Sequence, residues 1–283
     1  MNGVLVKNHT LSILIMVLIL AGSALLLYPT IGDYINSKHS SYMIASYNNA
    51  YQNTMEEQRK EMLLDAEQYN EALKSTKSPL FDPTQVVGYN RILDPTGTGV
   101  MGYIDIDKIG VELPIYHGTD PGVLQVGVGH IEGTSLPVGG ESTHCVLSGH
   151  RGLPSAKLFT ELDELAVGDT FTITVLDRVI TYQVDQIKTV LPDEVSDLQI
   201  EEGKDYCTLV TCTPYGINTH RLLVRGVRTD GDGMRTAGIV VSNEAFKIDT
   251  TIVATVIAVP GFLTVVIVTT LIGRRRSKHE KVK

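Results

Sequence analysis

The sequence is poor in several residue types that mark common protein classes. It has no tryptophan and only three cysteines in 283 residues. Three cysteines are too few for a disulfide scaffold, and their spacing matches no zinc-binding pattern. Because the count is odd, at least one thiol stays unpaired if the domain is exported to an oxidising compartment. A free thiol in such a compartment calls for a functional explanation.

Basic residues are also scarce, except at the two ends of the chain. The 24 lysines and arginines are outnumbered by 32 aspartates and glutamates, and the formal net charge is −8. Lys7 precedes the first long apolar run and Arg274–Arg276 follow the second, so the part between them is the most acidic. Nucleic-acid binding needs basic patches that face phosphates. The composition therefore argues against a nucleic-acid partner.

The first apolar run, residues 11–28, contains no charged residue. Its length of about 18 residues is near the lower limit for crossing a membrane. Two interpretations of residues 1–28 stay open, an uncleaved N-terminal transmembrane anchor and a signal sequence that is removed. Residues 25–28 continue the apolar run past the small residues that would suit cleavage, which favours the anchor.

The second apolar run, residues 251–272, is followed directly by a basic tail at residues 273–283. Positive residues stay on the cytoplasmic side of membrane helices, so this pattern predicts a transmembrane helix with a cytoplasmic tail. A buried core helix is the less favoured alternative. If both runs span the membrane, both termini are cytoplasmic and residues 29–250 are extracellular.

Residues 29–98 are predicted to form a helical extension that ends in a loop at about residues 75–90. Apolar residues recur at three- and four-residue steps, which is typical of amphipathic helices packed on a larger domain. Ser78-Pro79 and Asp82-Pro83 then break the pattern, because the residue before proline avoids helical geometry. The residues of the apolar stripe are Ile35, Met43, Ile44, Tyr47, Tyr51, Met55, Met62, Leu63, Ala66 and Tyr69.

Residues 99–228 change character to short β-type runs separated by Gly, Pro and Asp clusters. Many short strands with few helices predict a barrel or a sandwich. A short helix is expected around residues 156–165, and residues 229–250 are predicted to be a linker to the membrane helix. The expected strands are Gly102–Ile106, Leu113–Tyr116, Val126–Ile131, His144–Ser148, Thr170–Val175, Val179–Lys188, Thr208–Thr211 and Arg221–Val227.

Three segments carry residues suited to nucleophilic catalysis. His150 and Cys212 each follow a short apolar strand beside Gly or Pro, and Arg221 begins the next strand. A thiolate is the nucleophilic form of cysteine, and a nearby imidazole accepts the thiol proton and returns it to a leaving amine. A guanidinium stays protonated, so its role would be to stabilise an oxyanion or to position the substrate.

Structural roles for the same residues remain open on this reasoning. A lone cysteine at a strand end is usually a small buried apolar residue, and a lone histidine is usually a structural one. A non-catalytic membrane-tethered domain and a cysteine hydrolase that releases a free acid are both alternatives. His117, His130, His144 and His220 show no metal-ligand spacing and are expected to stabilise loops or strands, and no metal site is predicted.

The three segments resemble the signature of the sortases, cell-surface transpeptidases of Gram-positive bacteria. Residues 208–212, Thr-Leu-Val-Thr-Cys, are similar to the nucleophile motif of that family, and Arg221 follows nine residues later. His150 lies in a segment like the family's histidine segment. The resemblance implies a mostly β fold, an eight-stranded sortase β-barrel with short helices, the N-terminal extension and terminal transmembrane helices. It also implies catalytic roles for Cys212 as nucleophile, His150 as general acid and base, and Arg221 as stabiliser.

Residues 213–221 resemble the class C, pilin-polymerising sortases. This resemblance implies that the substrates are pilin subunits with a C-terminal Leu-Pro-x-Thr-Gly-like sorting signal, and that no metal or organic cofactor is needed. Cys212 would form a thioester at the Thr–Gly bond, and a lysine amine of the next pilin would resolve it into an isopeptide bond. The alternative within the family is a sortase that anchors proteins to a cell-wall precursor.

Class C sortases commonly carry a lid with an Asp-Pro-aromatic motif, and the best match here is Asp82-Pro83-Thr84. By this resemblance Asp82 would pair with Arg221 and Pro83 would stiffen the loop. Thr84 replaces the expected aromatic residue, and Phe81 lies just before the motif.

The resemblance also bears on the other two cysteines. Cys145 lies five residues before His150 and Cys207 lies five before Cys212. Because the strands that carry these segments are parallel neighbours in sortases, Cys145 and Cys207 would lie at one level, within reach of a disulfide. Two buried thiols are the alternative.

Overall fold

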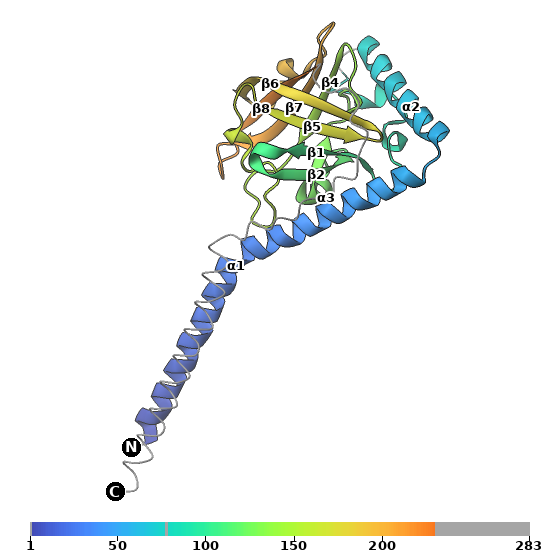
Figure 1. The fold of residues 1–283 in the computed structure, drawn as a ribbon. Coiled ribbons are helices and arrows are strands. Elements are labelled where there is room, and N and C mark those ends of the chain that lie inside the picture. The colour runs from blue at the N-terminus through green and yellow to red at the C-terminus, as the bar shows by residue number, and fades with distance from the viewer. Residues whose placement is uncertain (1, 77–78, 230–283) are drawn as a thin grey trace. The chain divides into compact units, whose positions relative to one another are not determined.

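The computed structural model describes residues 2–76 and 79–229 (Figure 1). The described residues contain a closed barrel of eight strands, which confirms the expected mostly β fold. The predicted transmembrane helix at 251–272, the basic tail at 273–283 and all but the first residue of the predicted linker at 229–250 lie outside the described residues.

The bounds of the elements are as follows. The strands are β1 (Val100–Ile106), β2 (Val111–His117), β3 (Val128–His130), β4 (Thr143–Ser148), β5 (Thr170–Val175), β6 (Arg178–Val190), β7 (Asp205–Thr213) and β8 (His220–Arg228). The α-helices are α1 (Asn2–Asn53), α2 (Glu56–Ser75) and α3 (Pro121–Val126). The 3-10 helices are η1 (Pro83–Gln85), η2 (Tyr89–Arg91), η3 (Asp107–Ile109), η4 (Leu162–Glu164) and η5 (Ser196–Leu198).

The strand order around the barrel is β1-β2-β3-β4-β7-β8-β6-β5, and β5 closes on β1. The pairs β2–β3 and β4–β7 are parallel, and the other pairs are antiparallel. Each expected strand has a counterpart in the structure. The helix expected at residues 156–165 is wrong, because only η4 is helical there. Leu158 has a φ of 41°, which a right-handed helix cannot accommodate.

The strands alternate between two faces, and both faces of β4 and β7 are apolar. Leu147 and Leu209 belong to the barrel core. Their neighbours in the sequence, Val146 and Val210, belong to a separate cluster on the other face. Side chains alternate across a strand, so this second cluster lies on the outside of the barrel. We call it the outer cluster, and its members are Val146, Val190, Leu198, Val210 and Leu223.

The N-terminal helices pack on the barrel through the predicted stripe. Tyr47 of α1 is fully buried, its hydroxyl donates to the Met101 carbonyl (3.0 Å), and it accepts the Leu176 N–H (2.9 Å). Asn70 of α2 exchanges two hydrogen bonds with Leu136 (2.7 and 3.1 Å). Ile35 and Met55, which the stripe also includes, are both 62% exposed, so the prediction that they pack is wrong.

The apolar N-terminal run and the extension form one unbroken helix, so the predicted boundary at residue 28 falls inside α1. Within the described residues, the part of α1 from Leu14 is long and apolar enough to cross a membrane, with a mean hydropathy of 2.3 in its most apolar window. Both an anchor and a signal sequence meet this criterion. The compact unit that contains the barrel begins at Asp33.

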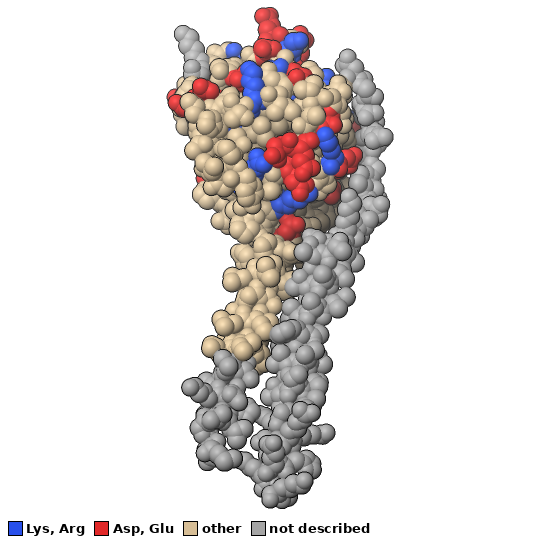
Figure 2. All heavy atoms as spheres, turned by 90° about the vertical axis from the view of Figure 1, so that its left-hand side faces the viewer, with Lys and Arg blue, Asp and Glu red and all other residues tan. Residues whose placement is uncertain are grey.

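Charged side chains of both signs lie together on the barrel surface (Figure 2). Arg225 of β8 forms a bidentate ion pair with Asp185 of β6 (2.8 and 3.1 Å). Arg228, at the end of β8, contacts Asp205 at the start of β7 (3.2 Å). Each of these two pairs joins neighbouring strands and matches an arginine with a carboxylate.

Two aspartates at the barrel surface have opposite pKa shifts. Burial and the carboxylates of Asp107 and Glu112 raise the pKa of Asp105 to about 6, whereas a hydrogen bond from Lys108 lowers the pKa of Asp169. A raised pKa means that the folded state binds the proton more tightly, so stability falls as pH rises from about 4 through about 6. For Asp169 the sign is reversed, and stability is lost at low pH.

We therefore predict that Asp105→Asn raises the melting temperature of the full chain in detergent at pH 7, and that this gain disappears near pH 4. The matched variant Asp169→Asn should lower the melting temperature at pH 7 because it weakens the contact with Lys108. Thermal unfolding at the two pH values measures both effects. An equal gain for Asp105→Asn at pH 4 and pH 7 would contradict the assigned shift.

Candidate active site

Three neighbouring strands bring the predicted catalytic residues to one end of the barrel. β4 runs parallel to β7 with Ser148 opposite Val210, and β8 runs antiparallel to β7 with Cys212 opposite Arg221. Residues directly opposite in an antiparallel pair have Cβ atoms about 4.5–5.5 Å apart. Cys212 and Arg221 are therefore adjacent side chains.

The register of β4 and β7 continues beyond the end of β4. The Gly149 N–H donates to the Val210 carbonyl (3.0 Å), and the Thr211 hydroxyl donates to the Gly149 carbonyl (2.8 Å). His150 is two residues beyond Ser148, as Cys212 is two beyond Val210. Extending this register by one more residue on each strand predicts that His150 lies level with Cys212 on the neighbouring strand.

Strand alternation places Cys212 and Arg221 on the face of the outer cluster. Cys212 is two residues after Val210, and Arg221 is two before Leu223, so each shares a face with a member of that cluster. Cys212, His150 and Arg221 are all partly exposed. An apolar surface thus leads along β4 and β7 to an accessible thiol.

Within the described residues, the side chains of Cys212, His150 and Arg221 make no hydrogen bonds to one another. Arg221 donates only to backbone carbonyls of its own loop, those of Asn218 (3.3 Å) and His220 (3.1 Å). Within the described part of the chain, neither the Cys212 thiol nor the His150 ring makes a hydrogen bond. Catalytic hydrogen bonds are often long or unformed before the substrate binds. The arrangement can support nucleophilic attack by a thiol with an adjacent imidazole and guanidinium.

Gly149 is needed because the loop after His150 folds back against it. A Cβ atom at position 149 would lie 2.6 Å from the Phe159 ring, and Phe159 is fully buried. The Phe159 N–H also donates to the His150 carbonyl (3.1 Å). The sequence reasoning did not identify Phe159, although the glycine before His150 was a signal of close packing.

Tyr215 links the loops that follow the two catalytic strands. Its ring lies against Gly152, where a Cβ atom would be 3.1 Å away, and the Arg151 guanidinium lies 5.9 Å from the ring centroid. Arg151 is also ion-paired with Asp163. These contacts fix the spacing between the His150 loop and the Cys212 loop.

The loop after α2 contacts the outer cluster through a residue that the predicted motif does not include. Leu80 is partly buried and packs on this cluster together with Ile131 and Val195. The chain just before it is held closely, because a Cβ atom on Gly133 would lie 2.4 Å from the Pro79 carbonyl oxygen. Pro79 and Leu80 therefore cover part of the apolar surface that leads to Cys212.

The predicted motif residues lie differently from the expectation. Asp82 accepts hydrogen bonds from the Thr84 hydroxyl (2.6 Å) and the Gln85 amide (3.0 Å), and these bonds lower its pKa. The expected ion pair between Asp82 and Arg221 is wrong, since each side chain has other partners. Phe81 is 73% exposed and covers nothing. Pro83 starts η1, and Thr84 closes a local turn in place of an aromatic plug.

The pairing of the other two cysteines agrees with the expected register but not with a disulfide. Cys145 and Cys207 lie directly opposite in the parallel β4–β7 pair. Both are free and buried, at 2% and 0% exposed, while Cys212 is partly exposed. A buried thiol cannot meet a substrate, so of the three cysteines Cys212 alone has an accessible thiol.

Three of the four histidines expected to stabilise loops or strands have partners in other segments, whereas His220 contacts only the hydroxyl of the adjacent Thr219 (2.9 Å) within the described residues. His117 contacts the Ile92 and Gly99 carbonyls (2.8 and 3.0 Å), and His130 contacts Tyr89 (2.9 Å). His144 joins the Gln199 carbonyl (2.8 Å) to the Thr208 hydroxyl (2.7 Å). Burial lowers the pKa of His117 and of His144, which favours their neutral forms.

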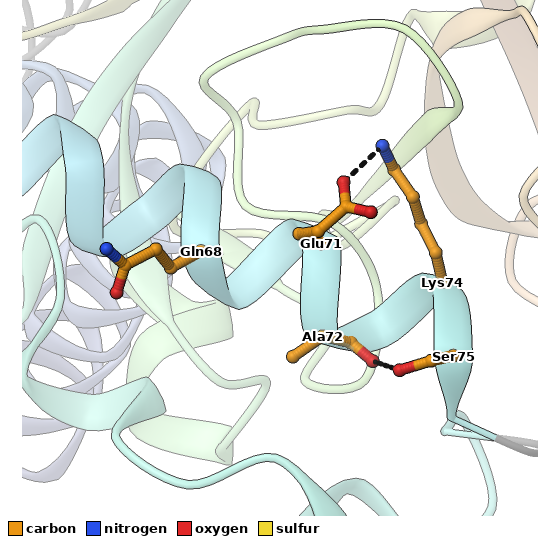
Figure 3. Close-up of a pocket in the computed structure, with 5 residues that line it drawn as sticks. All are labelled: Gln68, Glu71, Ala72, Lys74 and Ser75. Atoms are coloured by element: carbon orange, nitrogen blue, oxygen red, sulfur yellow. Dashed lines mark hydrogen bonds and ion pairs between the residues drawn. The ribbon is translucent and has the colours of Figure 1, made fainter.

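Two surface cavities lie near α2. One, of about 470 Å³, is formed by α2 alone, and its polar groups bond within the helix: Glu71 to Lys74 (2.7 Å) and the Ser75 hydroxyl to the Ala72 carbonyl (2.9 Å) (Figure 3). The other, of about 440 Å³, is lined in part by Leu80, His144 and Leu198. The second cavity adjoins the outer cluster, whereas the first has no chemistry-bearing residue.

Comparison with known proteins agrees with this geometry. Residues 104–229 match the family description "Sortase domain". The crystal structure of sortase C1 from Streptococcus agalactiae is 51% identical, with a TM-score of 0.62, and the match covers 68% of this chain and 100% of that one. The chain belongs to the sortase family.

Two further relatives support the assignment of this sortase. "Sortase C1 of GBS Pilus Island 1" is 46% identical with a TM-score of 0.64, covering 70% of this chain and 96% of that chain. Sortase D of Bacillus subtilis is 34% identical over 130 residues, which are 45% of this chain and 63% of that protein. The chain therefore spans less than two thirds of the length of this curated relative.

Proposed function

We propose that this sortase is a membrane-anchored cysteine transpeptidase that cleaves a Leu-Pro-x-Thr-Gly-like sorting signal and joins pilin subunits through lysine isopeptide bonds. The observation that carries the proposal is the strand register, which pairs Cys212 with Arg221, with His150 two residues beyond the end of the neighbouring strand β4. Cys212 and Arg221 share a face with an apolar surface suited to a peptide.

The reaction that these residues support has two acyl-transfer steps. Cys212 Sγ attacks the threonine carbonyl carbon, His150 takes up the thiol proton and delivers it to the departing glycine amine, and a thioester remains. The lysine amine of the next subunit then attacks the thioester. Its proton returns through His150 to the Cys212 sulfur, and an amide forms. Arg221 stabilises the oxyanion in both steps.

The outer cluster gives the sorting signal a place to bind. Along β4, His144 at the 440 Å³ cavity and His150 beside Cys212 are six residues apart. At about 3.3 Å per residue this distance is about 20 Å, which an extended peptide of about six residues spans. We place the leucine and proline of the signal over Val146 and Val210, and its threonine at Cys212.

The relatives support the proposal of a pilin substrate, and the apolar helix supports the proposed location at the membrane. The two sortase C1 structures compared above share 51% and 46% identity with this chain, and the name of the second refers to a pilus island. The apolar part of α1 would hold the enzyme at the membrane with its barrel outside the cell, and the predicted segment at 251–272 would add a second anchor and a cytoplasmic tail. Transfer to a cell-wall precursor is the alternative within the family.

The loop at residues 79–85 would act as a lid through Leu80 rather than through an aromatic residue. Leu80 lies on the surface assigned above to the sorting signal, so the peptide and Leu80 would compete for it. Asp82, Pro83 and Thr84 would shape the turn that follows and would not contact the catalytic residues.

The proposed activity is tested with the full chain in lipid nanodiscs, a sorting-signal peptide and a pilin subunit with a free lysine. We expect an isopeptide-linked product, and slow release of the free acid when no amine is present. Cys212→Ala should form neither product, while Cys207→Ala, a buried thiol, should keep most of the activity. If the rate of free-acid release does not change when an amine is added, the enzyme is a hydrolase instead.

Acceptor choice separates the two sortase alternatives. If a cell-wall precursor peptide resolves the thioester and pilin lysines do not, the pilin assignment is wrong. If neither acceptor gives a product and the Cys212→Ala change has no effect, only a non-catalytic role remains. That result would contradict the proposal.

The lid makes a separate prediction about peptide access. Leu80→Ala should raise kcat/KM for peptide hydrolysis by about three- to tenfold, because it removes the side chain that covers the outer cluster. The neighbouring variant Phe81→Ala should stay within twofold of the wild type, because Phe81 is exposed. Peptide hydrolysis assays measure both, and equal effects of the two changes would refute the role of Leu80.

A further inference from the structure

Asp33 of α1 makes a contact that the catalytic account has not used. It is the first acidic residue of the chain and lies just after the apolar run. Its Oδ1 atom accepts the backbone N–H of Lys157 (2.6 Å), 124 residues away in sequence. Lys157 lies in the loop between β4 and β5, the same loop that begins with His150. A residue of the N-terminal helix thus holds the main chain of the histidine loop.

Lys157 is fixed at its side chain as well as at its main chain. Its Nζ donates to the Ile109 carbonyl (2.7 Å) and forms an ion pair with Glu161 (2.6 Å). At this point the loop therefore contacts two other elements, α1 through Asp33 and η3 through Ile109. It also has an internal contact through Glu161. Of these contacts, only Asp33 holds the backbone N–H.

The next residue explains why the backbone needs an external partner. Leu158 has a φ of 41° and is 1% exposed. A residue with a Cβ atom adopts this left-handed region only when its surroundings hold it there. The hydrogen bond from the Lys157 N–H to Asp33 fixes the peptide unit between Ala156 and Lys157, one residue before Leu158, so it contributes to holding this conformation.

The contact reaches His150 two residues later. The Phe159 N–H donates to the His150 carbonyl (3.1 Å), and the Phe159 ring fills the space beside Gly149. His150 itself lies beyond the end of β4, so it has no strand ladder of its own. Its main chain depends on Phe159, and the position of Phe159 depends on the turn at Lys157 and Leu158.

We infer that Asp33 is a positioning residue for His150, through which the N-terminal helix fixes the loop that carries the catalytic histidine. Asp33 touches neither substrate nor thiol. It acts by keeping the 157–159 turn in the conformation that orients the His150 backbone. The inference rests on the proposed function in one respect, that His150 is the proton-transfer residue.

The test uses the full chain in nanodiscs and single-turnover acylation by a sorting-signal peptide. Asp33→Ala should lower the first-order acylation rate constant about tenfold with KM within twofold, because the proton transfer is affected and the peptide surface is not. Asp33→Asn keeps an oxygen that accepts the Lys157 N–H, so it should stay within about twofold of the wild type.

Tyr47→Phe is the matched control on the same helix. It removes two hydrogen bonds between α1 and the barrel, to Met101 and Leu176, that have no connection with the histidine loop. It should lower the melting temperature and leave the acylation rate constant within twofold. If Tyr47→Phe slows acylation as much as Asp33→Ala, or if Asp33→Asn loses as much as Asp33→Ala, the positioning role is refuted.

A second readout shows whether Asp33 acts through His150. Iodoacetamide alkylates accessible thiols, and Cys212 is the accessible one among the three. Asp33→Ala should slow alkylation of Cys212 severalfold in the wild-type background and leave it unchanged in the His150→Ala background. An equal effect in both backgrounds would overturn the inference. If His150→Ala itself changes neither acylation nor alkylation, the proposed function fails instead.

Discussion

The parallel pairing of β4 with β7 is the constraint on which the rest of the active site depends. It sets Ser148 opposite Val210, and the hydrogen bonds at Gly149 carry that register to the level of His150 and Cys212. A shift of one residue would turn Val146 and Val210 into the core and the core residues Leu147 and Leu209 outward. Burial on both faces therefore opposes any other register. The energy that holds the barrel together therefore also sets the position of Cys212 relative to the end of β4, from which the chain continues to His150.

Sequence reasoning could predict the parts of this structure that depend on local patterns. Eight apolar runs predicted eight strands, and each has a counterpart in the structure. The catalytic roles of Cys212, His150 and Arg221 came from the resemblance to sortases and stay a prediction. Resemblance to sortases gave the closed topology, which no local pattern specifies, and with it the pairing of Cys145 with Cys207. In the structure the two cysteines lie opposite each other as expected, but both thiols are free and buried in the core. Two buried small thiols fill the interior as apolar residues do, so the packing is satisfied without a bond.

The contacts that sequence reasoning missed are those made between segments far apart in the chain. Leu80 was not identified because a leucine between two prolines carries no motif, yet it rather than Asp82 or Phe81 reaches the outer cluster. Asp33 resembled an ordinary polar residue after a membrane run, and only the fold brings it to Lys157. The helix expected at residues 156–165 failed for a related reason. Tertiary contacts hold Leu158 in a conformation that its local propensity disfavours.

These features describe an enzyme in which Cys212 is partly exposed near the end of a barrel strand. The loop that contains His150 is held by a hydrogen bond to Asp33 of the N-terminal helix. The central claim is that Cys212 forms the covalent intermediate. The most direct measurement is intact-mass and peptide-mapping mass spectrometry after the full chain is mixed with a sorting-signal peptide in the absence of an amine. The account predicts one acyl group on Cys212 that hydroxylamine removes, with Cys145 and Cys207 unmodified. No adduct, or an adduct on either buried cysteine, would contradict it.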